Sequence, residues 1–333
     1  MSHRVVAITF LAALIAAAAL VPVPLAAQTA NAVKTWTPLK TTDGLPDLQG
    51  VYSNATTVPF ERPRNLGAKE FYTEQEVAER EKAAAAQAAA RAAADADPTV
   101  VHYDLGQFGL NQRVTASTNR TSQIVGSEGT IPPLLPAAQA RVAAKQAAAR
   151  GHNFDDAQHR GLSERCIMWG NEGPPMLSPG YNSDLQVMQG PGYVAIMQEM
   201  IHEARVIRMD GSPHIDPKIR LWMGDSIGHW EGDTLVVDTT NYNDKIVSNS
   251  FNCCPGAGSG LHVVERFRRV SADQIDYRYT VEDPNTYTRP WTAEVPMTRI
   301  DEPIFEYACH EGNYALQDIL AGARAKEAEA GRK

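Results

Sequence analysis

The sequence lacks the signatures of several large classes of protein. Lys and Arg form no cluster and the formal net charge is -8, which excludes a nucleic-acid-binding surface because phosphate recognition needs a basic face. No phosphate-binding loop, dinucleotide-binding glycine pattern or haem-attachment sequence is present. The zinc-protease motif H-E-x-x-H fails as well, since His202 and Glu203 are followed by Val206 where the second histidine belongs. A small molecule or a glycan is therefore the expected partner.

Long hydrophobic runs are also scarce, and the clearest one lies at the N-terminus. Residues 5–21 are apolar, follow a basic start that includes Arg4, and end at Pro22 and Pro24. Small residues come next, and no cysteine stands among them to carry a lipid. This pattern predicts a secretory signal peptide over residues 1–30 rather than a membrane anchor. The mature protein is expected to be periplasmic or secreted, with no membrane span.

Cysteine is rare, with four residues in the whole chain. No C-x-x-C pair is present, which disfavours a thiolate metal site, and an oxidising compartment favours disulfides. A bond between the adjacent Cys253 and Cys254 would close a strained ring. Cys166 and Cys309 are therefore the predicted structural disulfide.

The distribution of Ala-rich, loop-forming and β-type residues divides the chain after the signal peptide into two predicted segments. Residues 31–160 are expected to be irregular and helical, since loop-forming residues alternate with Ala-rich runs. Thr73 and Glu76 form a capping box at the start of one helix, which ends near residue 94. Pro136 occupies the first position of another helix, which ends near residue 150. These helices have almost no apolar stripe, so they are predicted to lie on the surface.

Residues 161–333 are predicted to form an antiparallel β domain with a C-terminal helix over residues 314–330, capped by Asn313. Runs of β-type residues alternate with tight turns, and strands joined so closely pair antiparallel. A meander of about eight strands would close into a lipocalin-like barrel or a curved sheet, because closure removes unpaired edges. The predicted strands are residues 48–53, 185–189, 193–198, 204–209, 234–239, 261–270, 274–281 and 304–308.

Four sequence blocks carry a resemblance to known proteins. They include M-G-D-S-x-G-H-W-E-G-D-T-L-V-V and Y-A-C-H-E-G-N-Y, and they lie at residues 222–238, 264–267, 283–291 and 307–314. The blocks resemble those of a large family of exported bacterial hypothetical proteins, and the resemblance covers most of the chain after Leu162. It implies export and a common fold, and it brings no established activity and no catalytic residues. The strand at residues 48–53 is, in addition, loosely lipocalin-like.

The block at residues 222–238 concentrates the side chains best suited to acid–base chemistry. His229 and Glu231 are two residues apart and would point the same way on an extended segment, and Asp225 lies shortly before them. An imidazole beside carboxylates can act as a general base with a fixed tautomer. These three residues, with His202, are the predicted catalytic residues. The structural alternative is a buried hydrogen-bond network that holds a hairpin together.

The same block contains a literal match to the serine-hydrolase pattern G-x-S-x-G at residues 224–228. That mechanism requires a helix directly after the serine, whose N-terminus helps to stabilise an oxyanion. Here a strand is predicted to follow, which argues against a serine hydrolase. A glycine-bounded turn is the expected structure.

Ligand contacts are predicted for aromatic and cationic side chains near this block. Trp222 and Trp230 could line an apolar pocket or stack on a ring. Arg289 and Trp291 belong to a proline-containing loop that could cover the pocket.

Two further histidines complete the set of predicted ligand-binding residues. His262 lies on a mixed strand face that could form a barrel lumen, and His310 directly follows Cys309. If His202, His229, His262 and His310 converged inside a barrel, they could hold zinc or copper. Isolated structural histidines are the expected outcome, so no metal ligand and no cofactor is assigned.

These observations favour an exported enzyme for a small apolar or aromatic compound, bound in a β-barrel pocket. The expected chemistry is cofactor-free acid–base catalysis by a lyase, a hydratase or a hydrolase. A non-catalytic, lipocalin-like binding protein is the alternative hypothesis, and a metal-dependent hydrolase with histidine ligands is the third.

Overall fold

The fold is built from residues 36–95, 115–178, 184–245 and 254–331, which are the residues that the computed structural model describes. The described residues from Pro38 onward are joined into one unit by their contacts. The predicted signal peptide lies outside the described residues. In the described part of the chain, no helix is both long enough and apolar enough to span a membrane.

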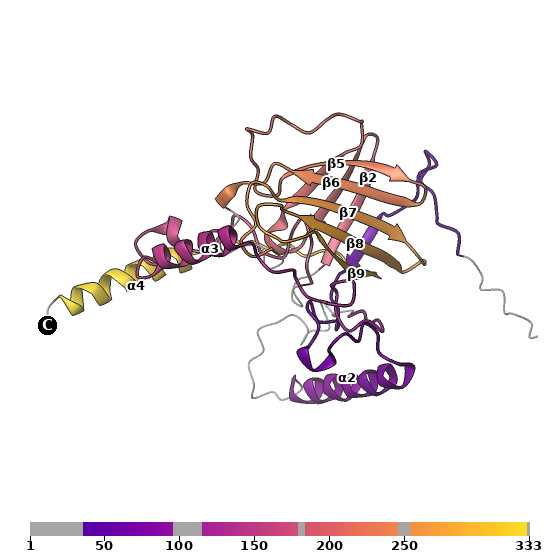
Figure 1. Cartoon of the computed structure of the whole chain (residues 1–333), viewed down its shortest axis with the longest axis horizontal. Coiled ribbons are helices and arrows are strands. Elements are labelled where there is room, and N and C mark those ends of the chain that lie inside the picture. Colours follow the sequence, from indigo (N-terminus) through magenta and orange to yellow (C-terminus); the bar gives the residue numbers. More distant parts are fainter. Residues whose placement is uncertain (1–35, 96–114, 179–183, 246–253, 332–333) are drawn as a thin grey trace, which may run out of the picture. The chain divides into compact units, whose positions relative to one another are not determined.

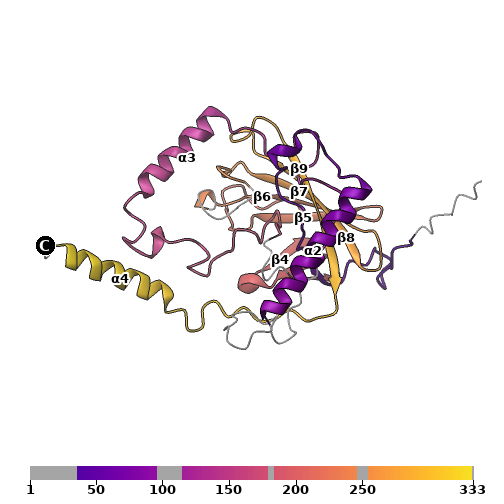
Figure 2. The ribbon, with the colours of Figure 1, turned by 90° about the horizontal axis from the view of Figure 1, so that it is seen from below.

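Nine strands of the described chain form a closed β-barrel (Figures 1 and 2). Each strand pairs with the next one in the sequence, and β9 pairs back with β1 through Val51 and Ile300. The predicted lipocalin-like meander is thereby confirmed at the level of fold class. The strands are β1 Gly50–Ser53, β2 Asp184–Gly190, β3 Tyr193–Gln198, β4 Ala204–Arg208, β5 Asp225–Glu231, β6 Thr234–Thr240, β7 His262–Arg269, β8 Gln274–Glu282 and β9 Trp291–Ile300.

One strand pair departs from the predicted antiparallel pattern. β4 and β5 are parallel and meet through Arg208 and Ile227. Their connection, residues 209–224, is long enough to carry the chain from one end of the barrel back to the other. The remaining neighbours are antiparallel, as their short connections predict.

The connections are distributed unequally between the two ends of the barrel. Short turns at residues 191–192, 232–233 and 270–273 join strands at one end. The longer connections 54–183, 199–203, 241–261 and 283–290 all leave from the opposite end, which we call the loop end. Because loops carry chemistry on a rigid scaffold, the loop end is where a functional site is expected.

Side chains of the protein itself occupy the barrel interior. Alternate residues of β7 to β9 are buried, and the rings of Phe267 and Tyr277 stack with centroids 4.8 Å apart. An ion pair between Arg205 on β4 and Glu265 on β7 lies among them, and both side chains are almost fully buried. The inward residues of these three strands include Val263, Glu265, Phe267, Ile275, Tyr277, Tyr279, Val281, Trp291, Ala293, Val295 and Met297.

A connection also enters the barrel from the loop end. Residues 168–177, which we call the cap segment, include the buried Met168, Met176 and Leu177. The amide of Met176 donates a hydrogen bond of 2.9 Å to the hydroxyl of Tyr277, an inward residue of β8. The hydroxyl of Tyr242 donates to the carbonyl of Pro174 at 3.0 Å. The cap segment therefore contributes to the core.

Three α-helices are present in the described residues, and they are α2 Glu74–Asp95, α3 Pro136–Ala149 and α4 Ala315–Ala330. The predicted capping box is confirmed, since the Glu76 amide donates to Thr73 Oγ1 and the Thr73 amide donates to the Glu76 carboxylate. The predicted cap Asn313 is wrong, because Tyr314 precedes α4 and makes no side-chain cap. Short 3-10 helices lie at Arg64–Leu66, Ala157–His159 and Met200–His202 (η5).

The strand predictions contained two omissions and one error. β5 and β9 were not predicted as strands, since residues 224–228 were expected to form a glycine-bounded turn and residues 289–291 a proline-containing loop. Residues 304–308 form no strand. β1 matches the strand predicted at residues 48–53, which lies in the segment 31–160 that was otherwise expected to be irregular and helical. The barrel therefore draws on both predicted segments.

Candidate functional site

A chain of alternating charges lies on the outer face of the barrel at its loop end. Asp225 opens β5, Asp238 is near the end of β6, and His262 opens β7. Leu235, Val237 and Thr239 point into the core, so the strand alternation turns Asp238 outward. His214, from the connection between β4 and β5, lies between the two aspartates. In order, the chain is Arg208, Asp225, His214, Asp238, His262 and Glu282, and we call it the His–Asp chain.

The first part of the His–Asp chain is the better buried. Asp225 has a side-chain exposure of only 7 %, and Arg208 binds both of its oxygens at 2.9 and 3.1 Å. His214 Nδ1 lies 2.8 Å from Oδ2 of Asp225, and the Ile215 amide donates to the same oxygen at 3.1 Å. Burial alone raises the pKa of Asp225, but the hydrogen bonds from His214, Ile215 and Arg208 outweigh it and lower the pKa. Asp225 is therefore held as a carboxylate.

The second part of the chain is a carboxylate shared by two imidazoles. Asp238 faces His214 Nε2 through Oδ1 at 2.9 Å and His262 Nε2 through Oδ2 at 3.0 Å. The hydrogen bond from His262 lowers the pKa of Asp238, and the same bond raises the pKa of His262. His262 Nδ1 lies 3.4 Å from Glu282, which is a long contact for a hydrogen bond.

The geometry restricts the protonation states of this part of the site. An ionised carboxylate only accepts hydrogen bonds. His214 faces a carboxylate through each of its two ring nitrogens. Among the four ring nitrogens of His214 and His262, Nδ1 of His262 has the longest contact and is therefore the least constrained. His262 is therefore the member of the chain best placed to exchange a proton with a bound molecule.

The connection that carries His214 is fixed to the barrel by one asparagine. Asn241 follows β6 with a φ of 60°, a left-handed conformation that Asn tolerates better than most residues. Its amide nitrogen lies within 3.2 Å of the carbonyls of Ile215, Asp216 and Ile219. These contacts hold the loop against the sheet, which positions His214.

The structure separates the residues that were predicted to be catalytic. His229 and Glu231 do share the outer face of β5, with His229 Nε2 at 3.3 Å from Glu231, and both are largely exposed. Glu231 also accepts a hydrogen bond of 2.8 Å from Arg266. Among the described contacts, none joins this surface cluster to Asp225, which belongs to the His–Asp chain.

The placement of the two predicted strand histidines needs correction. His262 lies on the outer face and not in a lumen, because its neighbours Val263 and Glu265 occupy the inner positions. His202 is not on a strand, since β3 ends at Gln198 and η5 follows. The side chain of His202 lies outside the described part of the chain.

The convergence of histidines that a metal site would require is not found for the histidine side chains that the structure describes. His229 and His262 both point outward from the barrel, so they cannot meet inside it. His310 is exposed. Among the described residues, no group of three His, Cys, Asp or Glu has the arrangement needed to hold a metal ion.

The predicted aromatic residues belong largely to the core. Trp291 opens β9 and is almost fully buried, and its ring meets Tyr279 and Phe60 edge-on at 6.0 Å. Trp230 points inward from β5, opposite the buried Leu235, and Trp222 packs against the same core. The indole N–H groups of Trp230 and Trp291 are buried, and no acceptor among the described residues lies within reach of them.

Two smaller predictions concern the loops and the G-x-S-x-G pattern. Arg289 forms an ion pair with Glu128 on the surface. The G-x-S-x-G residues form the start of β5 and not the expected turn, and the buried Ser226 Oγ lies 2.9 Å from Thr239 Oγ1. No helix follows this serine, as predicted.

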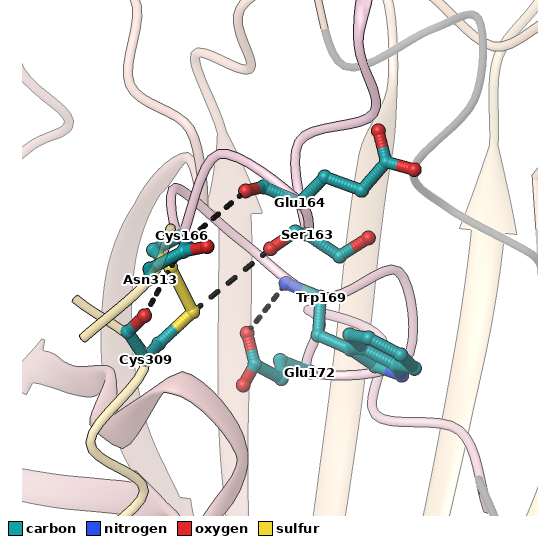
Figure 3. The surroundings of a disulfide bond; sticks show 7 residues. All are labelled: Ser163, Glu164, Cys166, Trp169, Glu172, Cys309 and Asn313. Atoms are coloured by element: carbon teal, nitrogen blue, oxygen red, sulfur yellow. Dashed lines mark hydrogen bonds between the residues drawn. A yellow bond between two sulfur atoms is a disulfide. The ribbon is translucent and has the colours of Figure 1, made fainter. Parts of the chain in front are cut away.

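The predicted disulfide is confirmed. Cys166 and Cys309 are joined by an S–S bond of 2.03 Å, and Figure 3 shows it beside the cap-segment residues Trp169 and Glu172. Asn313, the predicted helix cap, instead directs its amide at Cys166 Sγ and at the Glu164 carbonyl. Cys253 lies outside the described residues.

Sequence reasoning missed His214 and Asp238. His214 lies in a proline-rich connection without periodicity, and no spacing relates it to Asp225 or His262. Asp238 carried a usable signal, because it is the one charged residue within the apolar strand β6. Alternation around Val237 would have placed it on the outer face.

Fold and site together define a closed, mixed β-barrel that carries a chain of histidines and carboxylates at its loop end. No protein-family model matches the chain, and no curated protein matches its sequence.

Proposed function

We propose that the protein is an exported enzyme that performs acid–base chemistry on a small apolar or aromatic compound at the loop end of the barrel. The reaction class is elimination, hydration or hydrolysis without a cofactor. The observation that carries the proposal is the shared carboxylate of Asp238, which orients His262 through Nε2 at 3.0 Å. The export part of the proposal is supported by the N-terminal apolar run and by the disulfide.

The proposed roles follow from the contacts. His262 is the group that exchanges a proton with the substrate, and its Nδ1 is the atom involved because its contact with Glu282 is long. Asp238 is a positioning residue, which fixes the ring and raises the pKa of His262. His214 and Asp225 hold Asp238 in turn. The side chains that fill the barrel interior favour the loop end over the lumen for this chemistry.

The first experiment is a turnover screen of the mature protein with aryl esters, epoxides and conjugated enones. For a substrate that is converted, we expect His262→Gln to reduce kcat by about 10²- to 10⁴-fold, the range of general acid–base catalysis. His152→Gln is the matched control, because His152 makes a similar contact of 2.6 Å with Asp155 on an exposed loop. Unchanged turnover in the folded His262→Gln protein contradicts the proposal.

The pH dependence of turnover separates positioning from a purely structural role. If protonated His262 is the acid, kcat/KM falls as pH rises through its raised pKa. Asp238→Asn removes the main cause of that raised pKa, so the descending limb of the profile should move to lower pH. An NMR titration of the His262 ring checks the same shift without any substrate. A profile that stays in place in Asp238→Asn would rule out the positioning role.

Native mass spectrometry distinguishes the other hypotheses. A ligand that is retained but never converted supports the alternative, a lipocalin-like binding protein. The buried indole N–H groups of Trp230 and Trp291 favour that alternative, since each could donate a hydrogen bond to an acceptor of the ligand. A stoichiometric zinc or copper ion, together with activity lost to a chelator, would instead support a metal-dependent hydrolase.

A further inference from the structure

Three neighbouring strands of the barrel, β2, β3 and β4, share an outer face that is almost free of charge. Their inward residues, such as Leu185 and Ile207, are buried in the core, so strand alternation turns the residues between them outward. The pairing of the strands places these outward residues side by side, with Ala195 between Met188 and Val206. We call this surface the uncharged face, and its residues are Gln186, Met188, Gly190, Tyr193, Ala195, Met197, Ala204 and Val206.

Strands β7 and β8 show the pattern that is usual for a sheet face in water. An antiparallel sheet with one solvated face carries polar and charged side chains there. Most outward residues of these two strands are charged or ionisable, and the full set is His262, Val264, Arg266, Arg268, Gln274, Asp276, Arg278, Thr280 and Glu282. The uncharged face lacks this pattern, so contact with water alone does not explain it.

Two large side chains of the uncharged face are open to solvent. Tyr193 is 46 % exposed and Val206 is 57 % exposed, and they are the exposed large hydrophobic residues of the described barrel strands. Tyr193 pairs with Arg208, two residues after Val206, so Tyr193 and Val206 are diagonal neighbours on one face. Exposed apolar side chains that gather in one patch mark an interaction surface.

Small residues keep the middle of the uncharged face low. Gly190 pairs with Tyr193, and a Cβ added to Gly190 would lie 2.4 Å from the Tyr193 ring. The Tyr193 ring therefore covers the glycine. Ala195 lies between the longer side chains of Met188 and Val206 and is 9 % exposed. A face of this kind can pack closely against another sheet face.

The charged residues that border the uncharged face already have partners within the protein. Arg208 follows on the outer row of β4 and binds both oxygens of Asp225, at 2.9 and 3.1 Å. Asp184 begins β2, and the Ser53 hydroxyl binds its carboxylate. Since the chain has a formal net charge of -8 and this border provides no unpaired cation, an anionic membrane or polyanion is a poor partner for this face.

We propose that the uncharged face is a dimer interface, on which a second copy of this chain packs face to face about a twofold axis. A twofold axis brings the same patch of both copies together, so two negatively charged copies can meet here without facing like charges. Burial of Tyr193, Val206 and their apolar neighbours drives the association. Closure of the barrel favours pairing through a face, because a closed sheet has no edge strand to offer.

The size of the uncharged face sets the strength that is expected of the dimer. Val51 of β1 and Ile227 of β5 flank it with further apolar side chains, so the face extends over five strands. At the usual strand spacing and rise, five strands of about six residues cover about 24 by 20 Å. Two copies would bury about 1,000 Å² in total, which is at the low end for specific interfaces. The dimer is therefore reversible, with a Kd in the micromolar range.

The experiment measures sedimentation velocity of the oxidised, mature protein from low micromolar to submillimolar concentration. We expect the average sedimentation coefficient to rise with concentration as monomers form dimers. Val206→Lys places a positive charge on both facing surfaces and should weaken dimerisation at least about tenfold. Leu39→Lys is the matched control, because Leu39 is also 57 % exposed but lies outside the barrel strands. Its dimerisation should equal that of the wild type.

The outcomes decide between a dimer interface and its competitors. A protein that stays monomeric over the whole series overturns the proposal, and so does a dimer that Val206→Lys leaves intact. Monomers that bind phosphatidylcholine vesicles, and lose this binding in Val206→Lys, overturn it in favour of a lipid surface.

A second measurement on the wild type decides the matter if Val206→Lys fails to fold. The methyl signals of Met188 and Val206 in NMR spectra should shift with protein concentration, while those of Leu39 stay in place. Methyl signals of Met188 and Val206 that do not change with concentration overturn the proposal.

Discussion

At the residue scale, the barrel interior depends on one charged pair. The two terminal nitrogens of the Arg205 guanidinium each donate to one oxygen of the Glu265 carboxylate. Glu265 Oε1 also accepts a hydrogen bond of 2.7 Å from the Tyr277 hydroxyl. Tyr277 in turn accepts from the Met176 amide of the cap segment. A buried charge is tolerated when it is paired and its hydrogen bonds are complete, and these contacts meet that condition.

We predict that Arg205→Met destabilises the protein by roughly 3–5 kcal/mol, because it leaves the Glu265 carboxylate buried without its partner. The double variant Arg205→Met with Glu265→Leu should recover most of that loss. Chemical denaturation followed by fluorescence measures both. A single variant as stable as the wild type would show that Glu265 has another partner or is protonated.

At the element scale, the cap segment depends on a glycine and carries a buried acid. Gly173 has a φ of 81°, and an added Cβ would lie 2.5 Å from the Pro175 carbonyl carbon, so no other residue fits there. The turn that follows sends Met176 into the core and leaves the Glu172 carboxyl buried. The cap segment therefore couples core packing to an uncompensated carboxyl.

We predict that Glu172 makes stability depend on pH. In the folded protein its pKa is about 8, against 4.5 for the free side chain, so the folded state binds the extra proton between these values. Below pH 4.5 this group makes its whole contribution to the free energy of unfolding, and the contribution is lost as the pH rises to about 8. The loss is at most roughly 4–5 kcal/mol.

Glu172→Gln is neutral at every pH and should flatten that decline. Thermal unfolding from pH 4.5 to 8.5 compares the two proteins, with Glu311→Gln as the control on the exposed surface. Parallel curves for wild type and Glu172→Gln would mean that Glu172 does not hold its proton in the folded state.

At the scale of the whole molecule, the chain combines a closed barrel with a covalent tie between segments distant in the sequence. Closure through β1 and β9 leaves no sheet edge for pairing with other chains. The disulfide joins positions 143 residues apart, and the residues between them include strands β2 to β9. It therefore closes a loop around nearly all of the barrel.

We predict that Cys166→Ser with Cys309→Ser lowers the free energy of unfolding by about 2–5 kcal/mol, because a long loop is no longer restricted in the unfolded chain. Reduction of the wild type should produce a similar loss. Denaturant unfolding of the oxidised and reduced proteins provides the measurement. A loss confined to the loop end in hydrogen exchange, with the global stability unchanged, would contradict this account.

The candidate site was only partly predictable from the sequence. Asp225 and His262 were recognised as chemically capable, yet His262 was assigned to the wrong face of its strand. Strand alternation gives two faces but does not say which is inside when both carry polar residues, as with Glu265 inside and Val264 outside. His214 and Glu172 lie on irregular segments, where spacing carries no information about position.

Local features of the chain determined the fold class, the order of most strands, the capping box at Thr73 and the choice of Cys166 with Cys309. These depend on short-range rules of alternation, turn chemistry and capping, or on the small number of cysteines. Tertiary structure alone decided which residues meet at the loop end. The His–Asp chain joins residues distant in the sequence, and only the pairing of the barrel strands brings them together.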